Sequence, residues 1–346
     1  MTALTFDERG LGIGDRLIPW TDVRSVGLRT TSGGPWAEDV FWLFVLRDGV
    51  IELPGQLMTG TLLSALQTQL SGLDNEKIIL AMGSAEERMF RVWHQDAERA
   101  SWNDARHRTR FSLLVERLGG DSKAAAEAFE KLATAWDEPA RRYHNREHLA
   151  ECLNRLDLAG LEGAVKDVAE LALWFHDAIY LAGASDNEER SSQLLLSECH
   201  RLQVDRKTAE AAAALVRATG HGTYSDELGP EGALVLDVDL SILGSDPVRF
   251  LEYEYAIEEE FAKTSKLKFR IGRGRFLASL LARPSIFRTT FFRERYEAVA
   301  RAQLSALLES PRYRAFRLTS WLRNPLSRLF STPCRCRQPA APRCPA

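Results

Sequence analysis

Long apolar runs are absent from the 346-residue sequence, and cysteine is scarce. No uninterrupted run of 18 or more apolar residues occurs, so no membrane span is expected. Asp7, Glu8 and Arg9 stand where a secretory signal needs an apolar segment, which predicts no export by that route. Two of the five cysteines, Cys152 and Cys199, fall in helical patterns, so the cysteines do not suggest a disulfide framework. We therefore expect a reducing, cytoplasmic environment.

A large net charge is also missing. The chain contains 45 Lys+Arg and 48 Asp+Glu, which gives a formal charge of −3 at pH 7. Without a basic excess there is no electrostatic argument for binding a nucleic acid polymer. A chain of this length exceeds what one hydrophobic core usually organises, so two domains are expected.

The first 82 residues have the pattern of a small antiparallel β domain. Strand-like runs occur at residues 4–6, 11–13, 23–28 and 40–46. Asp48-Gly49 follows the last run and predicts a hairpin, because a type I′ turn needs positive φ at both central residues. One amphipathic helix is predicted at residues 59–70. Several strands capped by one helix resemble a bacterial pleckstrin-homology-like (PH-like) domain, which implies a protein or lipid partner.

Residues 84–320 carry apolar side chains at a period of 3.6, which predicts an all-helical domain. The expected fold class is therefore α+β, with two domains at 1–82 and 84–320. Residues 321–346 contain five arginines and no acid, and we interpret them as a disordered basic tail. The three cysteines of this tail are fewer than the four ligands of a structural zinc site.

Two histidine motifs in the helical half point to a metal site. In the first, His144 and His148 are one turn apart on the same side of a helix that begins at Asn145. In the second, His176 and Asp177 end an apolar helix. Burying this imidazole and carboxylate is costly without partners, and a divalent cation satisfies both groups at once.

A third motif places Asp237 and Asp239 in another apolar run, and His221 precedes it. Asp237 lies on a different helix face from Asp239, so we expect it to be a structural partner. Mixed imidazole and carboxylate ligands suit Mn²⁺, Mg²⁺, Fe²⁺, Ni²⁺ or Zn²⁺. One or two such ions would polarise a phosphoryl oxygen and make hydroxide near neutral pH.

The ordered set of these residues on a helical frame resembles the HD-domain metal-dependent phosphohydrolase superfamily. The His144-Asn145-x-x-His148 motif, the His-Asp pair and Asp239-Leu240-Ser241 are also similar to the pattern of cyclic nucleotide phosphodiesterases, a distant branch. The longer strings around these motifs resemble a bacterial family of predicted HD phosphohydrolases. The resemblance covers residues 84–318.

The resemblance implies that His148, His176, Asp177 and Asp239 are metal ligands, and that Asp177 bridges the ions if there are two. His144 matches the general acid of the phosphodiesterase branch. In simpler HD enzymes the first histidine of the set is itself a ligand, which leaves the roles of His144 and His148 open to exchange.

Three further residues are candidates for a second metal or for the substrate. His221 matches a histidine that supports a second ion in binuclear members. Glu188 has the same candidate role, or it is the third helical residue of a capping box that begins at Ser185. Arg273 is a candidate contact for the substrate phosphate. Glu258 stands where the family leads us to expect an arginine.

The predicted function is a metal-dependent phosphohydrolase. It would cleave a phosphate ester or anhydride of a nucleotide or small phosphorylated metabolite, with metal-bound hydroxide as the nucleophile. One alternative is a regulatory HD domain that binds a nucleotide without turnover. Another is a di-iron oxygenase of HD type.

Overall fold

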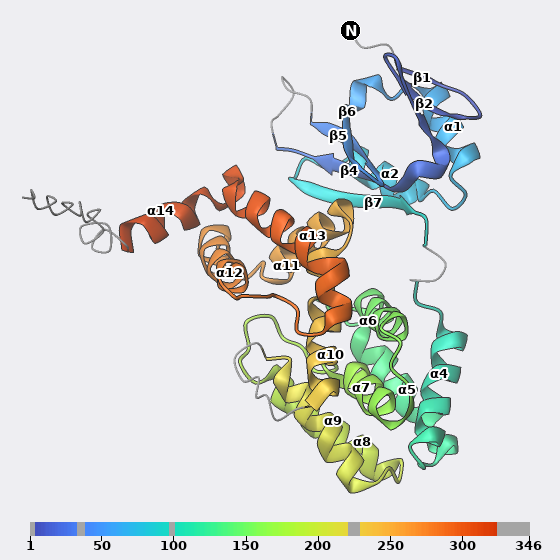
Figure 1. Ribbon diagram of the computed structural model, residues 1–346, viewed down its shortest axis with the longest axis vertical. Coiled ribbons are helices and arrows are strands. Elements are labelled where there is room, and N and C mark those ends of the chain that lie inside the picture. The colour runs from blue at the N-terminus through green and yellow to red at the C-terminus, as the bar shows by residue number, and fades with distance from the viewer. Residues whose placement is uncertain (1–3, 33–38, 97–100, 221–228, 324–346) are drawn as a thin grey trace, which may run out of the picture.

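A computed structural model describes residues 4–32, 39–96, 101–220 and 229–323 of the chain (Figure 1). Strands and two short helices form the N-terminal part, and the rest of the described chain is helical. The predicted α+β fold class is confirmed. Every helix in the described ranges is too short or too polar to cross a lipid bilayer.

Two antiparallel sheets make up the N-terminal domain. The three-stranded sheet has the order β1-β2-β3, and the four-stranded sheet has the order β6-β5-β4-β7. The strands are β1 (Leu4–Phe6), β2 (Gly10–Ile13), β3 (Arg16–Pro19), β4 (Val23–Thr30), β5 (Val40–Leu46), β6 (Gly49–Pro54) and β7 (Arg88–His94). Helices α1 (Gly60–Gln69) and α2 (Asn75–Met82) lie between β6 and β7 in the chain.

Strand β7 corrects the predicted domain boundary at residue 82. It pairs with β4 from Thr30 opposite Arg88 to Ser25 opposite His94, so the sheet ends only at His94. Local periodicity could not reveal this strand, because its pairing joins residues about sixty positions apart. The expected order, with all strands before one capping helix, is wrong for the same reason. Strand β3 and helix α2 were also not predicted.

The hairpin between β5 and β6 is confirmed, but its turn lies one residue earlier than predicted. Leu46 pairs with Gly49, so the two loop residues are Arg47 and Asp48. Neither Asp48 nor Gly49 has positive φ. The predicted type I′ turn over Asp48-Gly49 is therefore wrong, because Gly49 already belongs to the ladder.

The four-stranded sheet packs on both faces. Trp42 and Phe44 of β5 point into the core of the N-terminal domain, while Leu43 and Val45 contact a different apolar cluster. This alternation follows from the two-residue period of a strand. The second cluster includes Val248 of helix α11 (Pro247–Glu260), which lies beneath β7 in Figure 1. The sheet thus joins the two domains.

The helical domain surrounds a second, larger core. Its remaining helices are α4 (Asp104–Arg117), α5 (Ser122–Trp136), α6 (Arg146–Leu158), α7 (Gly163–Phe175), α8 (Asn187–Arg201), α9 (Arg206–Ala218), α10 (Gly229–Asp239), α12 (Lys266–Leu281), α13 (Thr290–Glu309) and α14 (Arg314–Arg323), with a 3-10 turn η4 (Leu240–Gly244) after α10. Helix α14 extends three residues into the segment predicted as a tail. Residues 324–346 of that prediction lie outside the described ranges.

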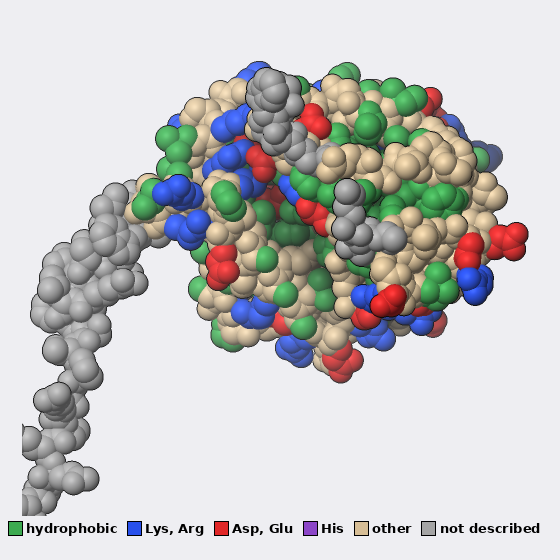
Figure 2. Space-filling view, turned by 90° about the horizontal axis from the view of Figure 1, so that it is seen from above, with side chains coloured by type: hydrophobic (Ala, Val, Ile, Leu, Met, Phe, Trp, Pro, Cys, Tyr) green, Lys and Arg blue, Asp and Glu red, His purple; other side chains and the backbone are tan. Residues whose placement is uncertain are grey.

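The visible surface has mixed charge. Seen from the side of the N-terminal domain (Figure 2), basic and acidic side chains are interspersed over most of the face. This distribution agrees with the small net charge of the sequence.

Gly27 of β4 provides a test of the joint between the domains. A Cβ at this position would lie 2.5 Å from Val248 Cγ1 and 3.2 Å from the carbonyl oxygen of Phe90. Valine is stiff about χ1 in a helix, so Val248 cannot easily move aside. We expect Gly27→Val to lower the free energy of unfolding by about 1–3 kcal/mol, measured by urea denaturation.

The matched control is Gly49→Val in the same sheet, where an added Cβ meets nothing within 4 Å. Equal free energies of unfolding for the two variants would show that Val248 of α11 does not pack closely against Gly27 of β4.

Candidate metal centre

Three helices bring the four predicted ligands together. Asn145 caps α6, since its side chain accepts the backbone N–H groups of Glu147 and His148, and this places His148 in the first helical turn. Helix α7 is fully buried over its last two turns, and His176 is the residue that follows its last residue, Phe175. Asp239 is the last residue of α10.

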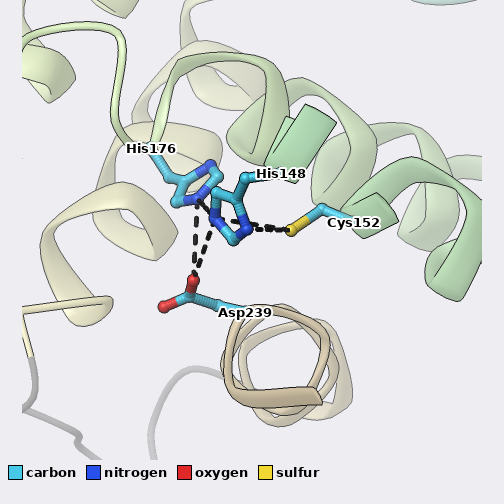
Figure 3. A group of neighbouring side chains, drawn as sticks. All are labelled: His148, Cys152, His176 and Asp239. Carbon is cyan, nitrogen blue, oxygen red and sulfur yellow. Dashed lines mark hydrogen bonds and ion pairs between the residues drawn. The ribbon is translucent and has the colours of Figure 1, made fainter. Parts of the chain in front are cut away.

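The donor atoms of these residues converge at one point. His148 Nε2 lies 3.1 Å from His176 Nε2 and 3.4 Å from Asp239 Oδ1. Asp177 Oδ2 lies 3.3 Å from His176 Nε2 and 3.9 Å from His148 Nε2. Ligand atoms bound about 2.1 Å from one ion lie roughly 3.0–3.4 Å from each other. The two imidazole nitrogens and the Asp239 carboxylate therefore fit a single divalent ion (Figure 3). Asp177 lies within 4 Å of both imidazole nitrogens but is not part of the group whose ligand atoms all lie within 4.8 Å of one another.

The ring of His176 is held in the form that binds metal. Its Nδ1 lies 2.8 Å from the carbonyl oxygen of Leu173, which can only accept, so Nδ1 carries the proton. The lone pair is then on Nε2, toward the cluster, which is the usual arrangement for a metal-ligating histidine. Burial lowers the pKa of His148, despite its hydrogen bond with Asp239, and so favours the neutral ring that metal binding requires.

Cys152 belongs to the cluster but was not among the predicted ligands. The ligand atoms of His148, Cys152, His176 and Asp239 all lie within 4.8 Å of one another. However, Cys152 Sγ is 3.7 Å from both ring nitrogens of His148, so the thiol lies beside the ring, not in line with Nε2 (Figure 3). Burial raises the pKa of this thiol. The four-residue spacing from His148 on one helix is the sequence signal that could have indicated it.

Arg141 is a second residue that the sequence analysis missed. Its buried guanidinium donates to the carbonyl oxygens of His144 at 3.1 Å, Asp177 at 2.6 Å and Ala178 at 3.0 Å. These bonds tie the segment before α6 to the segment after α7. Arg141 thereby ties the backbone of Asp177, one of the predicted ligands, to that of His144.

His144 is oriented by Glu260, the last residue of α11. Glu260 Oε2 accepts from His144 Nδ1 at 2.7 Å and from the Tyr180 hydroxyl at 3.0 Å. Glu260 Oε1 accepts three consecutive backbone N–H groups that end at His144. Burial tends to raise the pKa of Glu260, but the bonds from His144 hold it at about 2.

The protonated form of His144 is favoured at the same time. Burial opposes its charge, but the carboxylates of Asp177, Glu260 and Asp239 outweigh burial and raise the pKa of His144. The cluster of mutually close ligand atoms includes His148 and not His144. The geometry thus favours His148 as the ligand of the pair.

The cluster lies at the wall of a cavity of about 250 Å³. His144, Asp177 and Asp239 face this cavity together with aromatic and polar side chains. These are Tyr143, Tyr180, Asn187, Glu188, Thr219, Tyr253, Phe261, Arg273 and Phe276. A small ligand in the cavity would therefore contact both the carboxylates of the cluster and His144.

Arg273 lines this cavity as predicted, but its charge is already matched. It donates from Nη2 to Glu254 Oε1 at 2.7 Å, and its guanidinium lies between the rings of Tyr253 and Phe276. Its Nε is buried without a hydrogen-bond partner among the described residues. Glu258 instead pairs with Arg270 at 3.1 Å and does not line the cavity.

The other predicted residues have different outcomes. Glu188 lines the cavity outside the ligand cluster, and His221 lies outside the described residues. The capping box beginning at Ser185 is wrong, because the N-cap of α8 is Asp186 and its side chain makes no capping bond. Asp237 is the expected structural partner. Its carboxylate accepts hydrogen bonds from the backbone N–H groups of Arg288 and Thr289 and from the Thr289 hydroxyl, just before α13.

Comparisons of the chain with protein-family models, with curated proteins and with solved structures return no match.

Metal binding should depend on His176 and not on Cys152. We expect His176→Ala to lose the bound divalent ion, because it removes a nitrogen that no neighbouring group replaces. Cys152→Ala should keep it, since the thiol does not face the convergence point. Elemental analysis of both variants, with circular dichroism to confirm folding, checks this. Equal loss in the two variants would make the thiol a ligand.

Glu260 should make the free energy of unfolding depend on pH in the acid range. Its pKa falls from 4.5 to about 2 in the folded chain, so its contribution is full above pH 4.5 and is lost as the pH falls toward 2. The shift corresponds to about 3 kcal/mol. Glu260→Gln should remove that part of the pH dependence in urea titrations from pH 6 to 2.

The exposed Glu309 at the end of α13 offers a control, since Glu309→Gln should leave the profile unchanged. A profile for Glu260→Gln that matches the wild type would contradict the assignment.

Proposed function

We propose that the chain is a metal-dependent phosphohydrolase of the HD type. The observation that carries the proposal is the convergence of two imidazole nitrogens and two carboxylates on a cavity that also contains His144. The order of these residues in the sequence, and the helical frame that holds them, agree with the resemblance to HD-domain enzymes.

One or two divalent ions are the proposed cofactors, held by His148, His176, Asp177 and Asp239. Nitrogen and oxygen donors of this kind suit Mn²⁺, Mg²⁺, Fe²⁺, Ni²⁺ or Zn²⁺. A divalent ion bound there supplies Lewis-acid polarisation of a phosphoryl oxygen and a lower pKa for water. Glu188, which also lines the cavity, is the candidate for a second ion among the described residues.

His144 is the proposed general acid. Its Nδ1 donates to Glu260, so Nε2 is the ring nitrogen that exchanges a proton with the substrate. The carboxylates of Asp177, Glu260 and Asp239 raise the pKa of His144, which favours the protonated ring that can donate to the leaving oxygen. After His144 donates its Nε2 proton, the neutral ring keeps the proton on Nδ1, and that N–H still donates to Glu260. Tyr180, stacked on the ring at 4.0 Å, limits its rotation.

The cavity favours a small substrate with an apolar or aromatic part. Its volume of about 250 Å³ is below the usual range for pockets that hold drug-sized ligands. Phe261 and Phe276 line the cavity and would contact the part of the substrate that does not carry the phosphate. A nucleotide or another small phosphorylated metabolite is the proposed substrate class.

The test is a phosphate-release screen of the purified chain. Nucleotides and sugar phosphates are offered in Mn²⁺, Mg²⁺ or Ni²⁺, with His176→Ala as the negative control. Turnover that needs metal and is lost in His176→Ala supports the proposal. Metal and nucleotide binding without release would favour the regulatory alternative, and an oxygen-dependent activity with an iron pair would favour the oxygenase.

The variant His144→Asn should distinguish a general-acid role of His144 from a role as metal ligand. We expect a fall in kcat of roughly 100- to 10,000-fold with metal content unchanged, because the general acid is lost and the cluster is kept. His200→Asn on the exposed end of α8 is the matched control and should keep full activity. Loss of metal in His144→Asn would instead assign His144 as a ligand.

A further inference from the structure

A second cavity lies where the two domains meet. It has a volume of about 440 Å³, within the range of small-ligand pockets. Its walls are the ends of β4 and β7, one side of α6 and the start of α11. The lining residues are Arg24, Arg91, His94, Gln95, Asp96, Glu151, Asn154, Arg155, Asp157, Leu158, Ser245, Asp246 and Arg249.

Three of the four acids on these walls already have partners. Glu151 accepts two hydrogen bonds from Arg249, at 2.7 and 2.9 Å. Asp157 accepts a hydrogen bond from Arg110 at 2.7 Å. Arginines therefore balance the charges of Glu151 and Asp157. Asp246 caps α11 and also accepts a serine hydroxyl of β4 at 2.8 Å, so hydrogen bonds from neutral groups satisfy its oxygens.

Arg91 and Arg249 are balanced in the same way. Arg91 pairs with Glu147, Glu151 and Glu252, and Arg249 pairs with the last two of these. These pairs connect β7 with α6 and α11. The two arginines thus belong to the joint between the domains.

Two other arginines have no such partner. Arg24 donates to the side-chain oxygen of Gln95, and Arg155 lies over the ring of Tyr296 at 5.1 Å. Within the described ranges, neither guanidinium has a carboxylate within 4.0 Å. The remaining acid, Asp96, is exposed at the rim, where solvent weakens its effect. The cavity therefore holds two half-buried positive charges from two different domains.

A neutral histidine adds hydrogen-bonding capacity between them. Burial and the charge of Arg91 lower the pKa of His94, so its ring is neutral near pH 7. A neutral imidazole offers one donor and one acceptor.

We propose that this cavity binds a small phosphate-bearing anion, with Arg24 and Arg155 as its phosphate contacts. The planar fork of arginine donates two parallel bonds to phosphate oxygens, and a phosphate group carries close to two negative charges at neutral pH. The ligand would bridge the N-terminal sheet and helix α6. This proposal does not depend on the proposed hydrolase activity. None of the four predicted metal ligands, His148, His176, Asp177 and Asp239, lines this cavity.

The two sites are nevertheless neighbours. A water-sized space of about 20 Å³ is lined by His148 and Asp239 of the metal cluster and also by Glu151, Arg155 and Ser245. The last three residues also line the larger cavity. The experiment must therefore distinguish binding at the metal cluster from binding at the joint.

Isothermal titration of the full chain in excess chelator tests the proposal. The probes are pyrophosphate and AMP, with citrate as a carboxylate probe of similar charge. We expect pyrophosphate or AMP to bind more tightly than citrate. Arg24→Met and Arg155→Met should each weaken binding about tenfold or more, because each removes bonds to a charged group.

Two controls keep the test specific. Arg293→Met removes an exposed arginine of α13, and His176→Ala removes a group of the metal cluster. Both should bind as the wild type does. Thermal unfolding without ligand checks that each variant folds, and Arg155→Lys should retain part of the affinity because it keeps the charge.

Four results would overturn the proposal. The first is no binding of pyrophosphate or AMP to the wild type. The second is undiminished binding by Arg24→Met and Arg155→Met. The third is binding lost in His176→Ala, which would assign the phosphate to the metal cluster. The fourth is tighter binding of citrate than of either phosphate probe. None of these outcomes depends on turnover, so failure here is distinct from failure of the proposed hydrolase.

Discussion

The buried meeting of two imidazoles and two carboxylates is the constraint on which the helical domain depends. Groups of this kind are costly to take out of water unless their charges and lone pairs are matched. Their positions require three helices to end or begin at one point. Helix α7 meets this need with two fully buried turns before His176, and α6 meets it with the Asn145 cap that places His148. Arg141 then joins the two connecting segments through three carbonyl oxygens.

Helix α11 serves both domains. Its first turns pack against the four-stranded sheet, with Val248 against Gly27 and Arg249 in the charged network around Arg91. Its last residue, Glu260, accepts five hydrogen bonds and orients His144. One rigid element therefore runs from the joint between the domains to the catalytic acid that we propose.

Helix α6 has a similar double position. One side presents His148 and Cys152 to the donor cluster, and a neighbouring side presents Glu151 and Arg155 to the cavity between the domains. Helical periodicity explains this arrangement, because residues four apart share a side of the helix. His148 and Cys152 are one such pair, and Glu151 and Arg155 are another on the neighbouring side. The two sites that we propose thus lie on neighbouring sides of one helix.

The sequence by itself determined the fold class, most of the early strands and the two histidines and Asp239 of the cluster, because these depend on local period and on motifs at short spacing. Tertiary structure alone decided the rest. Strand β7 forms through pairing with β4, and its residues carry no local strand signal strong enough to predict it. Cys152, Arg141 and Glu260 acquire their positions from neighbours 4, 36 and 116 residues away. The choice of His148 over His144 in the cluster required the actual distances, since both histidines share one side of the predicted helix. Contacts between distant segments set these features, and periodicity carries no information about them.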